Sequence, residues 1–255
     1  GNHLIHVGHG ELASGLVGDG RMAEPEEIVA HLNNFFHQKT DLLERKILLT
    51  AGPTYEAIDP VRFIGYRSSG KMGVAIAKRL EARGAEVELI LGPSNQQVEH
   101  PKIKVTKVES AAEMYQAALK YFPNCDGAIL AAAVADYRPQ NVQAQKIKKS
   151  GTTLELKLEK TEDIAANLGQ QKRKDQFLVG FALETNNEME NAKSKLKRKN
   201  FDFIVLNSLK DRGAGFGHDT NKVTILNKGG NIHSFELKSK QAVAEDIVNQ
   251  VVELL

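Results

Sequence analysis

The chain has 255 residues and a formal net charge of only +2, so its overall charge does not draw it to nucleic acid or to an anionic membrane surface. This length suffices for one sizeable α/β domain, or for a domain plus a fragment. The single cysteine, Cys125, excludes an internal disulfide and fits a reducing compartment. Because no run of ~18 apolar residues and no signal peptide is present, no membrane span is expected.

The first 45 residues differ in pattern from the rest of the chain. Residues 1–30 do not have the pattern of a complete fold, and the polar stretch 34–45 marks a boundary. After it, apolar strands are expected at 46–51, 86–91, 103–108 and 126–133. Helices are expected at 72–83 and from Ser110 to about Tyr121, where Ser110 and Glu113 form a capping box.

The second half continues the alternation of strands and helices. Strands are predicted at 153–160, 177–182 and 201–206, and helices from Thr161, at 188–199 and at 239–254. Two further strands near 222–227 and 232–237 form a hairpin around Gly229-Gly230. This pattern predicts an α/β fold with an open, Rossmann-like, mostly parallel sheet flanked by helices and a small antiparallel strand extension.

A long loop follows the first strand and ends in Ser68-Ser69-Gly70-Lys71, at the start of a helix. Its ~18 residues far exceed the usual strand-to-helix connection, and its end offers an anion site of backbone N–H groups. The GxxxxGK pattern at 65–71 is followed by Met72 instead of the Ser or Thr of a P-loop, and no Rossmann G-x-G-x-x-G is present. A plain surface loop remains the alternative.

A carboxylate follows the fourth strand of this first half. The run Ala131-Ala132-Ala133 leads to Asp136, and the small side chains let a flat ligand approach the backbone. Asp136 is suited to accept a ligand hydroxyl or to hold a cation that bridges phosphates. The alternative is that Asp136 only caps the next turn.

Two groups of lysines are candidates for contacting phosphates. Lys146 begins the sequence KIKK at 146–149, and Lys195 and Lys199 lie four residues apart on one helix face, which suits a triphosphate. Solvent-facing basic segments are the alternative for both groups. The lysines are not interleaved with aromatic residues, so nucleic acid is not the expected ligand.

Seven segments, read in order, resemble bacterial phosphopantothenoylcysteine synthetases, the synthetase half of the bifunctional coenzyme A biosynthesis protein. The resemblance covers residues 46–255. Its motifs are TAGPTYEAIDPVRFI (50–64), SSGKMG (68–73), AAAVADYRP (131–139), KIKK (146–149), VGFALET (179–185), KLKRKNFDFIVLN (195–207) and GFGHDTNKVTIL (215–226).

The resemblance implies a CTP-dependent ligase that acts with Mg²⁺ in the cytoplasm. The carboxylate of 4′-phosphopantothenate attacks the α-phosphorus of CTP, and the amine of L-cysteine then attacks the resulting acyl-cytidylate. It also implies a homodimer, which forms a higher oligomer when fused to the decarboxylase, and neither nucleic acid nor membrane as partner. We expect protomer contacts at 59–64 and 222–237. The alternative for the latter strands is that they extend the sheet within one chain.

The resemblance also assigns site residues by matching motifs. Lys146 matches the catalytic lysine, and Asp136 a position contacting both nucleotide and metal. The substrate positions are Tyr66, Ala132 and Asp136, and Asn207 is a further nucleotide candidate. The nucleotide positions are Ser68, Gly70, Gly73, Ala131, Ala132, Asp136, Lys146, Glu162, Asp163, Ile164, Ala165, Phe181, Lys195 and Lys199.

Two departures from the family pattern affect these expectations. Tyr66 stands where the family usually has Asn, and a phenol lacks the paired donor and acceptor of an amide. Residues 1–36 resemble the end of a flavin-dependent decarboxylase domain, with Ser14 where the family often has Cys. The FMN-binding core of that domain is missing here and a linker follows at 37–45, so no decarboxylase activity is expected. A dinucleotide-binding oxidoreductase and a non-catalytic nucleotide-binding regulatory module remain the alternatives.

Overall fold

The computed structural model describes residues 4–12, 14–36, 40–148, 152–184, 186–208 and 218–255. The chain divides into two compact units, residues 1–40 and 41–255. The first unit pairs β1 (Gly8–Glu11) with β2 (Val17–Arg21) in an antiparallel hairpin, followed by α1 (Pro25–Phe36). Among the described residues, no helix combines the length and the apolar character needed to cross a bilayer.

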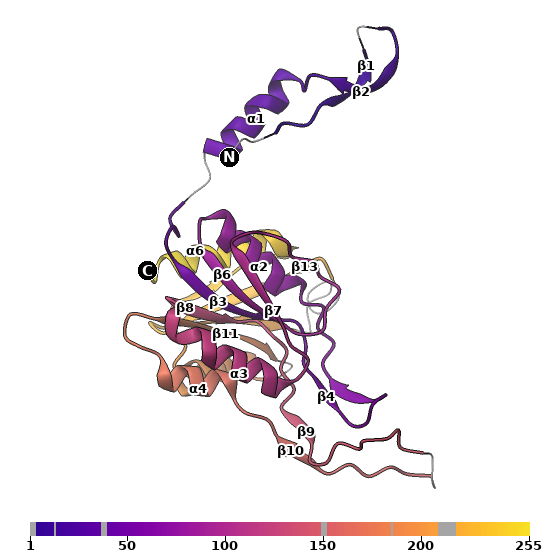
Figure 1. Cartoon of the computed structure of the whole chain (residues 1–255). Coiled ribbons are helices and arrows are strands. Elements are labelled where there is room, and N and C mark those ends of the chain that lie inside the picture. Colours follow the sequence, from indigo (N-terminus) through magenta and orange to yellow (C-terminus); the bar gives the residue numbers. More distant parts are fainter. Residues whose placement is uncertain (1–3, 13, 37–39, 149–151, 185, 209–217) are drawn as a thin grey trace. The chain divides into compact units, whose positions relative to one another are not determined.

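The second unit is built on an eight-stranded sheet with the order β15-β14-β12-β11-β8-β3-β6-β7 (Figure 1). The six strands from β12 to β7 run parallel, and β14 and β15 extend that sheet antiparallel. The strands are β3 (Lys46–Ala51), β6 (Glu86–Leu91), β7 (Ile103–Lys107), β8 (Gly127–Leu130), β11 (Phe177–Glu184), β12 (Phe203–Ser208), β14 (Val223–Asn227) and β15 (Ile232–Ser234).

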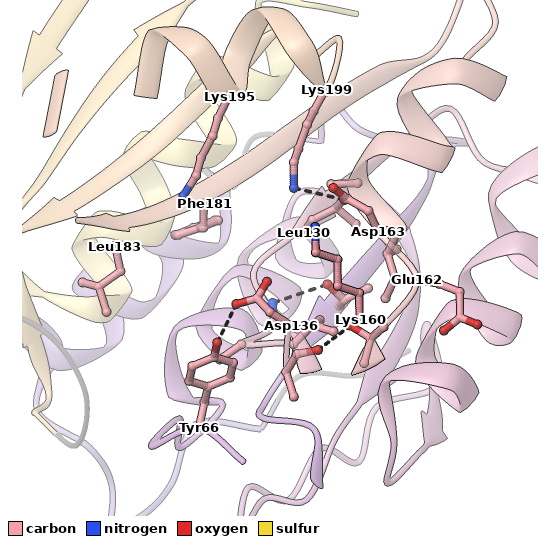
Figure 2. Close-up of a pocket in the computed structure, with 18 of the residues that line it drawn as sticks. Tyr66, Leu130, Asp136, Lys160, Glu162, Asp163, Phe181, Leu183, Lys195 and Lys199 are labelled. Carbon is pink, nitrogen blue, oxygen red and sulfur yellow. Dashed lines mark hydrogen bonds and ion pairs between the residues drawn. The ribbon is translucent and has the colours of Figure 1, made fainter. Parts of the chain in front are cut away.

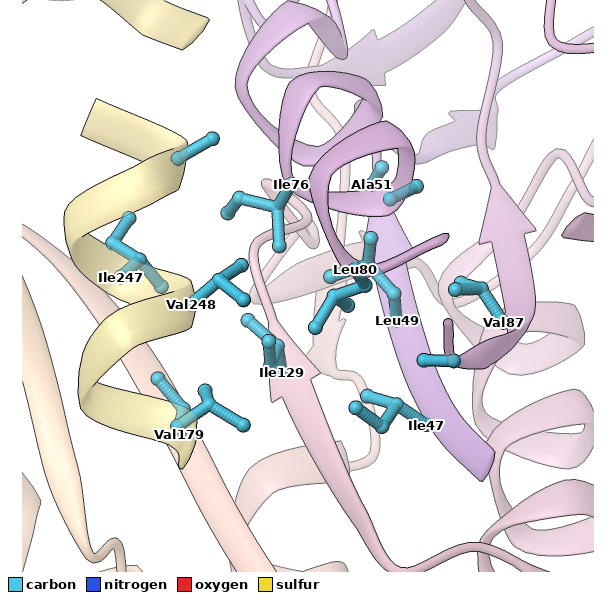
Figure 3. Close-up of a cluster of buried hydrophobic side chains, with 14 of the residues drawn as sticks. Ile47, Leu49, Ala51, Ile76, Leu80, Val87, Ile129, Val179, Ile247 and Val248 are labelled. Carbon is cyan, nitrogen blue, oxygen red and sulfur yellow. The ribbon is translucent and has the colours of Figure 1, made fainter. Parts of the chain in front are cut away.

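Helices cover both faces of this sheet because its central strands are apolar on both sides. In β3, Ile47 and Leu49 belong to the core shared with α2 (Lys71–Ala82) and α6 (Lys240–Val252), as Figure 3 shows. Leu48 points the opposite way, into the core shared with the helices of the other face, which are α3 (Ala111–Tyr121), α4 (Ile164–Gln171) and α5 (Glu188–Arg198). The α/β fold expected from the sequence is therefore confirmed.

The strand order reverses direction between β3 and β8. From β3 the chain builds outward through β6 to β7, whereas β8, β11 and β12 build toward the other edge. At such a switch point the loops leaving the two central strands diverge and open a crevice at the carboxyl ends of the strands. This topology places the loops after β3 and β8 beside one another.

Two short antiparallel hairpins leave this end of the sheet (Figure 1). One pairs β4 (Tyr55–Ala57) with β5 (Phe63–Gly65), and the other pairs β9 (Tyr137–Pro139) with β10 (Leu158–Lys160). A third small pair joins β13 (Thr220–Asn221) to β16 (Lys238–Ser239).

Several local predictions are confirmed, and two are corrected. Ser110 caps α3, since its hydroxyl accepts a hydrogen bond from the Glu113 N–H at 3.2 Å. The strand predicted at 153–160 is reduced to Leu158–Lys160, which pairs only with β9. The helix predicted from Thr161 begins at Ile164 with Asp163 as its cap, because the Thr161 hydroxyl donates to the Ala135 carbonyl at 2.6 Å.

Candidate functional site

A cavity of about 830 Å³, here called the large cavity, lies at the carboxyl ends of β3, β8 and β11. Its floor is formed by Leu130 and the alanines that follow β8, and Phe181 and Leu183 of β11 line it. The full lining is Thr50, Tyr66, Leu130, Ala132, Ala133, Val134, Ala135, Asp136, Tyr137, Lys160, Thr161, Glu162, Asp163, Ile164, Ala165, Phe181, Leu183, Lys195, Lys199 and Phe201.

The loop after β8 carries Asp136 into this cavity on a fixed backbone. The Ala135 N–H donates to Thr54 Oγ1 at 2.9 Å, and the Thr161 N–H donates to the Asp136 carbonyl at 3.1 Å. The Asp136 carboxylate accepts a hydrogen bond from the Tyr66 hydroxyl at 2.6 Å (Figure 2). This bond raises the pKa of Tyr66, with further contributions from desolvation and from the negative charge of Asp136.

The start of α4 forms another wall of the large cavity. Asp163 caps the helix by accepting from the Ala166 N–H at 3.0 Å, and Ile164 and Ala165 form the first turn. Burial raises the pKa of Asp163, but the Ala166 N–H and the Lys199 ammonium outweigh burial, and the pKa lies below its usual value. Asp163 is therefore a stable negative charge beside Lys199.

Lys195 of α5 and Lys199, the residue that follows the helix, reach into the large cavity from the side opposite Asp136 (Figure 2). Lys195 donates to Glu184 Oε1 at 2.5 Å, and Lys199 to Asp163 Oδ1 at 3.0 Å. A carboxylate orients each ammonium group, because a charge-assisted hydrogen bond restricts the conformations of a long side chain. The two ion pairs lie one helical turn apart on this wall of the cavity.

A smaller cavity of about 170 Å³ adjoins the large one and shares Ala132, Ala133, Phe181 and Leu183 with it. It lies at the start of α2 and is otherwise lined by Ser68, Ser69, Gly70, Lys71, Met72, Gly73, Ala131, Ala182, Asn207, Asn221 and Lys240. Gly70 precedes the helix with a φ of 75°, a value that glycine adopts without strain. A Cβ on Gly73 would come within 2.4 Å of the Ala51 Cβ, so glycine lets the helix approach β3.

Positive charge and an open acceptor are combined in the small cavity. Burial lowers the pKa of Lys240, as does the neighbouring Lys71 ammonium, while Asp219 acts in the opposite direction. Asn207 Oδ1 is buried without a hydrogen-bond partner among the described residues. The four N-terminal amides of a helix also carry partial positive charge, so this cavity suits an anion with a hydrogen-bond donor beside it.

The structure places Lys146 outside both cavities. Its side chain is exposed, in the segment between β9 and β10, and it does not line the large or the small cavity. The neighbouring Ile147 is held by hydrogen bonds to Asp59 and Arg62. The Gly-rich part of the sequence at 211–219 lies largely outside the described residues.

Asp136 is the residue of this site that suits a divalent cation. Among the residues that the structure describes, no cluster of three or more His, Cys, Asp or Glu side chains is placed to hold a metal. Mg²⁺ usually keeps several waters and binds proteins through one or two carboxylates plus substrate phosphates. Asp136, which lines the large cavity, fits that pattern as one carboxylate ligand and does not fit a metal held by protein ligands alone.

The sequence profile for the "DNA/pantothenate metabolism flavoprotein C-terminal domain" matches residues 42–255. The chain belongs to this family. A crystal structure of the C-terminal domain of the coenzyme A biosynthesis bifunctional protein CoaBC is similar to it, with 39% sequence identity and a TM-score of 0.72. That similarity covers 85% of this chain and 98% of the crystallised domain.

Curated relatives extend the similarity to the first unit. A protein from an unknown prokaryotic organism, named cysteine/cysteine sulfinic acid decarboxylase, is 55% identical over 259 residues, which is 100% of this chain and 72% of the relative. The CoaBC protein of Haemophilus influenzae is 47% identical over 254 residues, or 99% of this chain. The chain spans 62% of the length of that CoaBC relative.

The structure brings together most of the residues that the family motifs suggested. Ten line the large cavity, namely Tyr66, Ala132, Asp136, Glu162, Asp163, Ile164, Ala165, Phe181, Lys195 and Lys199. Ser68, Gly70, Gly73, Ala131 and Asn207 line the small cavity, and Lys146 lines neither. Glu184, which orients Lys195, and Lys240 were not among the residues predicted from the sequence. The position of Glu184 at the end of a buried strand was the available signal.

Proposed function

We propose that this chain is a phosphopantothenate–cysteine ligase of coenzyme A biosynthesis that uses CTP to activate the carboxylate. One observation carries the proposal: a carboxylate and a pair of lysines face each other across an 830 Å³ cavity at the switch point of the sheet. The 39% identity with the CoaBC C-terminal domain, over nearly all of that domain, supports the assignment.

The reaction proceeds in two displacements. In the first, a carboxylate oxygen of 4′-phosphopantothenate forms a bond to the α-phosphorus of CTP, the bond to the bridging oxygen breaks, and pyrophosphate leaves. In the second, the amine of L-cysteine attacks the acyl carbon, CMP leaves with the bonding electron pair, and the amine loses a proton. Activation is needed because a free carboxylate is a poor electrophile.

The residues of the large cavity fit the demands of the first displacement. Negative charge grows on the departing pyrophosphate, and Lys195 and Lys199 are placed to stabilise it. Their carboxylate partners, Glu184 and Asp163, hold the ammonium groups near the required direction before the nucleotide arrives. The α2 amides and Lys240 of the small cavity offer a second position for phosphate oxygens.

Nucleotide and metal are assigned as parts of the same site. We assign CTP as the nucleotide because the motifs that match are of the bacterial type, with its base and ribose between Phe181 and the 162–165 turn. Asp136 would hold Mg²⁺ together with the phosphates, and the ion would neutralise phosphate charge during attack. Lys146 is the assigned catalytic lysine, and its exposed side chain extends from the segment between β9 and β10.

The organisation of the whole protein forms part of the proposal. Residues 1–36 are assigned as the end of a flavin-dependent decarboxylase domain, 37–45 as a linker and 46–255 as the ligase domain, in a cytoplasmic homodimer that becomes a higher oligomer with the decarboxylase. Apolar side chains are exposed on the two hairpins, among them Val61, Phe63, Val142 and Leu156, and these favour a protomer contact there.

Product analysis with two matched variants tests the proposal. The chain is incubated with 4′-phosphopantothenate, CTP, Mg²⁺ and isotopically labelled cysteine, and mass spectrometry follows the labelled amide and CMP. We expect one CMP per amide, loss of both in Lys146→Ala, and normal yield in Lys148→Ala, since both lysines are exposed in the same segment. A wild-type chain that forms no amide, or an unimpaired Lys146→Ala variant, contradicts the assignment.

A decarboxylation is the second candidate, because the relative with 55% identity bears the name of a cysteine and cysteine sulfinic acid decarboxylase. The chain covers 72% of that relative. Release of CO₂ from cysteine, cysteine sulfinate or the ligase product, measured with the same preparation, distinguishes the two candidates.

A further inference from the structure

Asp59 is a buried carboxylate that the ligase chemistry does not use. It lies in the turn between β4 and β5 with 3% of its surface exposed. Its Oδ1 accepts from the N–H groups of Val61 at 2.8 Å and Arg62 at 2.9 Å, a pattern that closes its own turn. A turn of this kind requires only one carboxylate oxygen, so Oδ2 is free for another role.

Oδ2 of Asp59 connects this turn to the lysine-bearing segment. It accepts from the Ile147 N–H at 3.1 Å and from Arg62 Nη1 at 2.7 Å. Arg62 Nη2 donates to the Ile147 carbonyl at 3.2 Å, so both backbone groups of Ile147 are bound from one side. The contact joins residues 85 to 88 positions apart in the sequence.

A second backbone contact fixes the same segment four residues before Ile147. The Gln143 N–H donates to the Ile58 carbonyl at 3.0 Å, one residue before Asp59. Residues 143 and 147 are therefore both attached to the β4–β5 turn, and Lys146 lies between the two attachments. Constraining the backbone on either side of a lysine removes much of the freedom that its side chain would have in a free loop.

We propose that Asp59 is a positioning residue for Lys146: it holds the segment 143–147 on the β4–β5 turn and thereby fixes the place from which the Lys146 ammonium group acts. The inference rests on the proposed function for the role of Lys146, but the docking of the segment does not depend on that function. Burial raises the pKa of Asp59, yet the N–H groups of Ile147, Val61 and Arg62 outweigh burial and hold the pKa below its usual value, in keeping with a carboxylate that stays charged.

Asp59→Asn is the decisive variant because it keeps the shape of the side chain. Whichever way the amide is oriented, its NH₂ group faces two donors, either the N–H groups of Val61 and Arg62 or the Ile147 N–H and the Arg62 guanidinium. Ile147→Pro is the second variant, since it removes the donated N–H and changes no residue of the turn. Asp175→Asn is the matched control, because Asp175 pairs with Arg173 on the surface and does not line either cavity.

The first measurement is hydrogen exchange resolved to single amides. We expect the Ile147 amide to lose protection in Asp59→Asn while amides of β3 keep it, and no change in Asp175→Asn. Retained protection of Ile147 in Asp59→Asn overturns the docking. If Asp59→Asn does not fold, as judged by the β3 amides, faster exchange at Gln143 in Ile147→Pro supports the docking and unchanged exchange overturns it.

The second measurement is pyrophosphate release from CTP. We expect kcat to fall about 10- to 100-fold in Asp59→Asn with the KM for CTP nearly unchanged, since a misplaced catalytic group costs rate and not nucleotide binding. In a Lys146→Ala background the same substitution is expected to have no further effect. If Asp59→Asn lowers kcat by the same factor in the Lys146→Ala background as in the wild type, the positioning role is overturned. If the wild-type chain releases no pyrophosphate, the proposed function is overturned, and hydrogen exchange alone decides the docking.

Discussion

The hydrogen bond between Tyr66 and Asp136 predicts that removing the Tyr66 hydroxyl tightens nucleotide binding. The Tyr66 oxygen lies 2.6 Å from Asp136 Oδ2, and Asp136 is the assigned ligand of the metal–phosphate group. A nucleotide that uses Asp136 must first displace the phenol. Tyr66→Phe keeps the ring and removes this competition.

The size of the effect follows from the charge and the exposure of the pair. A hydrogen bond to a charged group contributes about 1.5–3 kcal/mol. Tyr66 is 42% exposed, so water replaces part of this bond, and about 1 kcal/mol is the appropriate magnitude. This corresponds to a roughly fivefold lower Kd for CTP in the presence of Mg²⁺.

Isothermal titration of CTP with Mg²⁺ measures this change. Tyr137→Phe is the matched control, because Tyr137 also lines the large cavity but has no recorded hydrogen bond to Asp136 among the described residues. We expect tighter binding in Tyr66→Phe and an unchanged Kd in Tyr137→Phe. An unchanged or weaker affinity in Tyr66→Phe refutes the competition between the phenol and the nucleotide.

Three further predictions concern single groups. Lys195→Ala is expected to raise the KM for CTP about tenfold, because losing a charged contact to phosphate removes roughly 1.4 kcal/mol of binding free energy. Lys197→Ala, on the exposed side of α5, is expected to leave the KM for CTP unchanged in the same steady-state assay. Burial raises the pKa of Cys125 to about 11, so we expect no reaction with a thiol reagent at pH 8 until the chain is unfolded, and prompt labelling of the native protein is the contrary result. The pKa of Asp163 lies below its ordinary value of 3.8, so the stability that its charge contributes is complete above pH 3.8 and is lost as the pH falls through the folded-state pKa. Between pH 5 and pH 2 we therefore expect the melting temperature to fall more steeply for the wild type than for Asp163→Asn. Parallel curves of melting temperature against pH contradict this.

Local signals in the sequence predicted the elements that depend on neighbours along the chain. The capping of α3 by Ser110 was correct because its donor, the Glu113 N–H, is three residues away. At the start of α4 the same reasoning chose Thr161, which fails because the Thr161 hydroxyl is taken by the Ala135 carbonyl, a partner 26 residues away. Asp163, two residues later, caps the helix instead.

The short hairpins were missed for a related reason. Strands such as β4 and β9 have only three residues, too few for an alternating pattern to be visible, and only their pairing defines them. The sheet strands are longer and bury both faces, so β3 and β6 were predicted within their observed bounds.

Residues of the candidate site could be grouped from the sequence where a single element carries them. Lys195 and Lys199 had to share a helix face, and both line the large cavity. Glu184 was not predicted, since its contact with Lys195 at 2.5 Å depends on how α5 packs beside β11. The segment that bears Lys146 meets the β4–β5 turn through the hydrogen bond from the Ile147 N–H to Asp59, 88 residues earlier, and no local pattern records that contact.

Pyrophosphate release in the absence of cysteine tests the central claim most directly, because it isolates activation of the carboxylate. The chain is mixed with 4′-phosphopantothenate, Mg²⁺ and either CTP or ATP, and pyrophosphate is measured over the first turnover. We predict about one pyrophosphate per site with CTP, much less with ATP, and none when 4′-phosphopantothenate is omitted. Release that does not depend on 4′-phosphopantothenate, or no release with either nucleotide, contradicts a site built to activate a carboxylate on CTP.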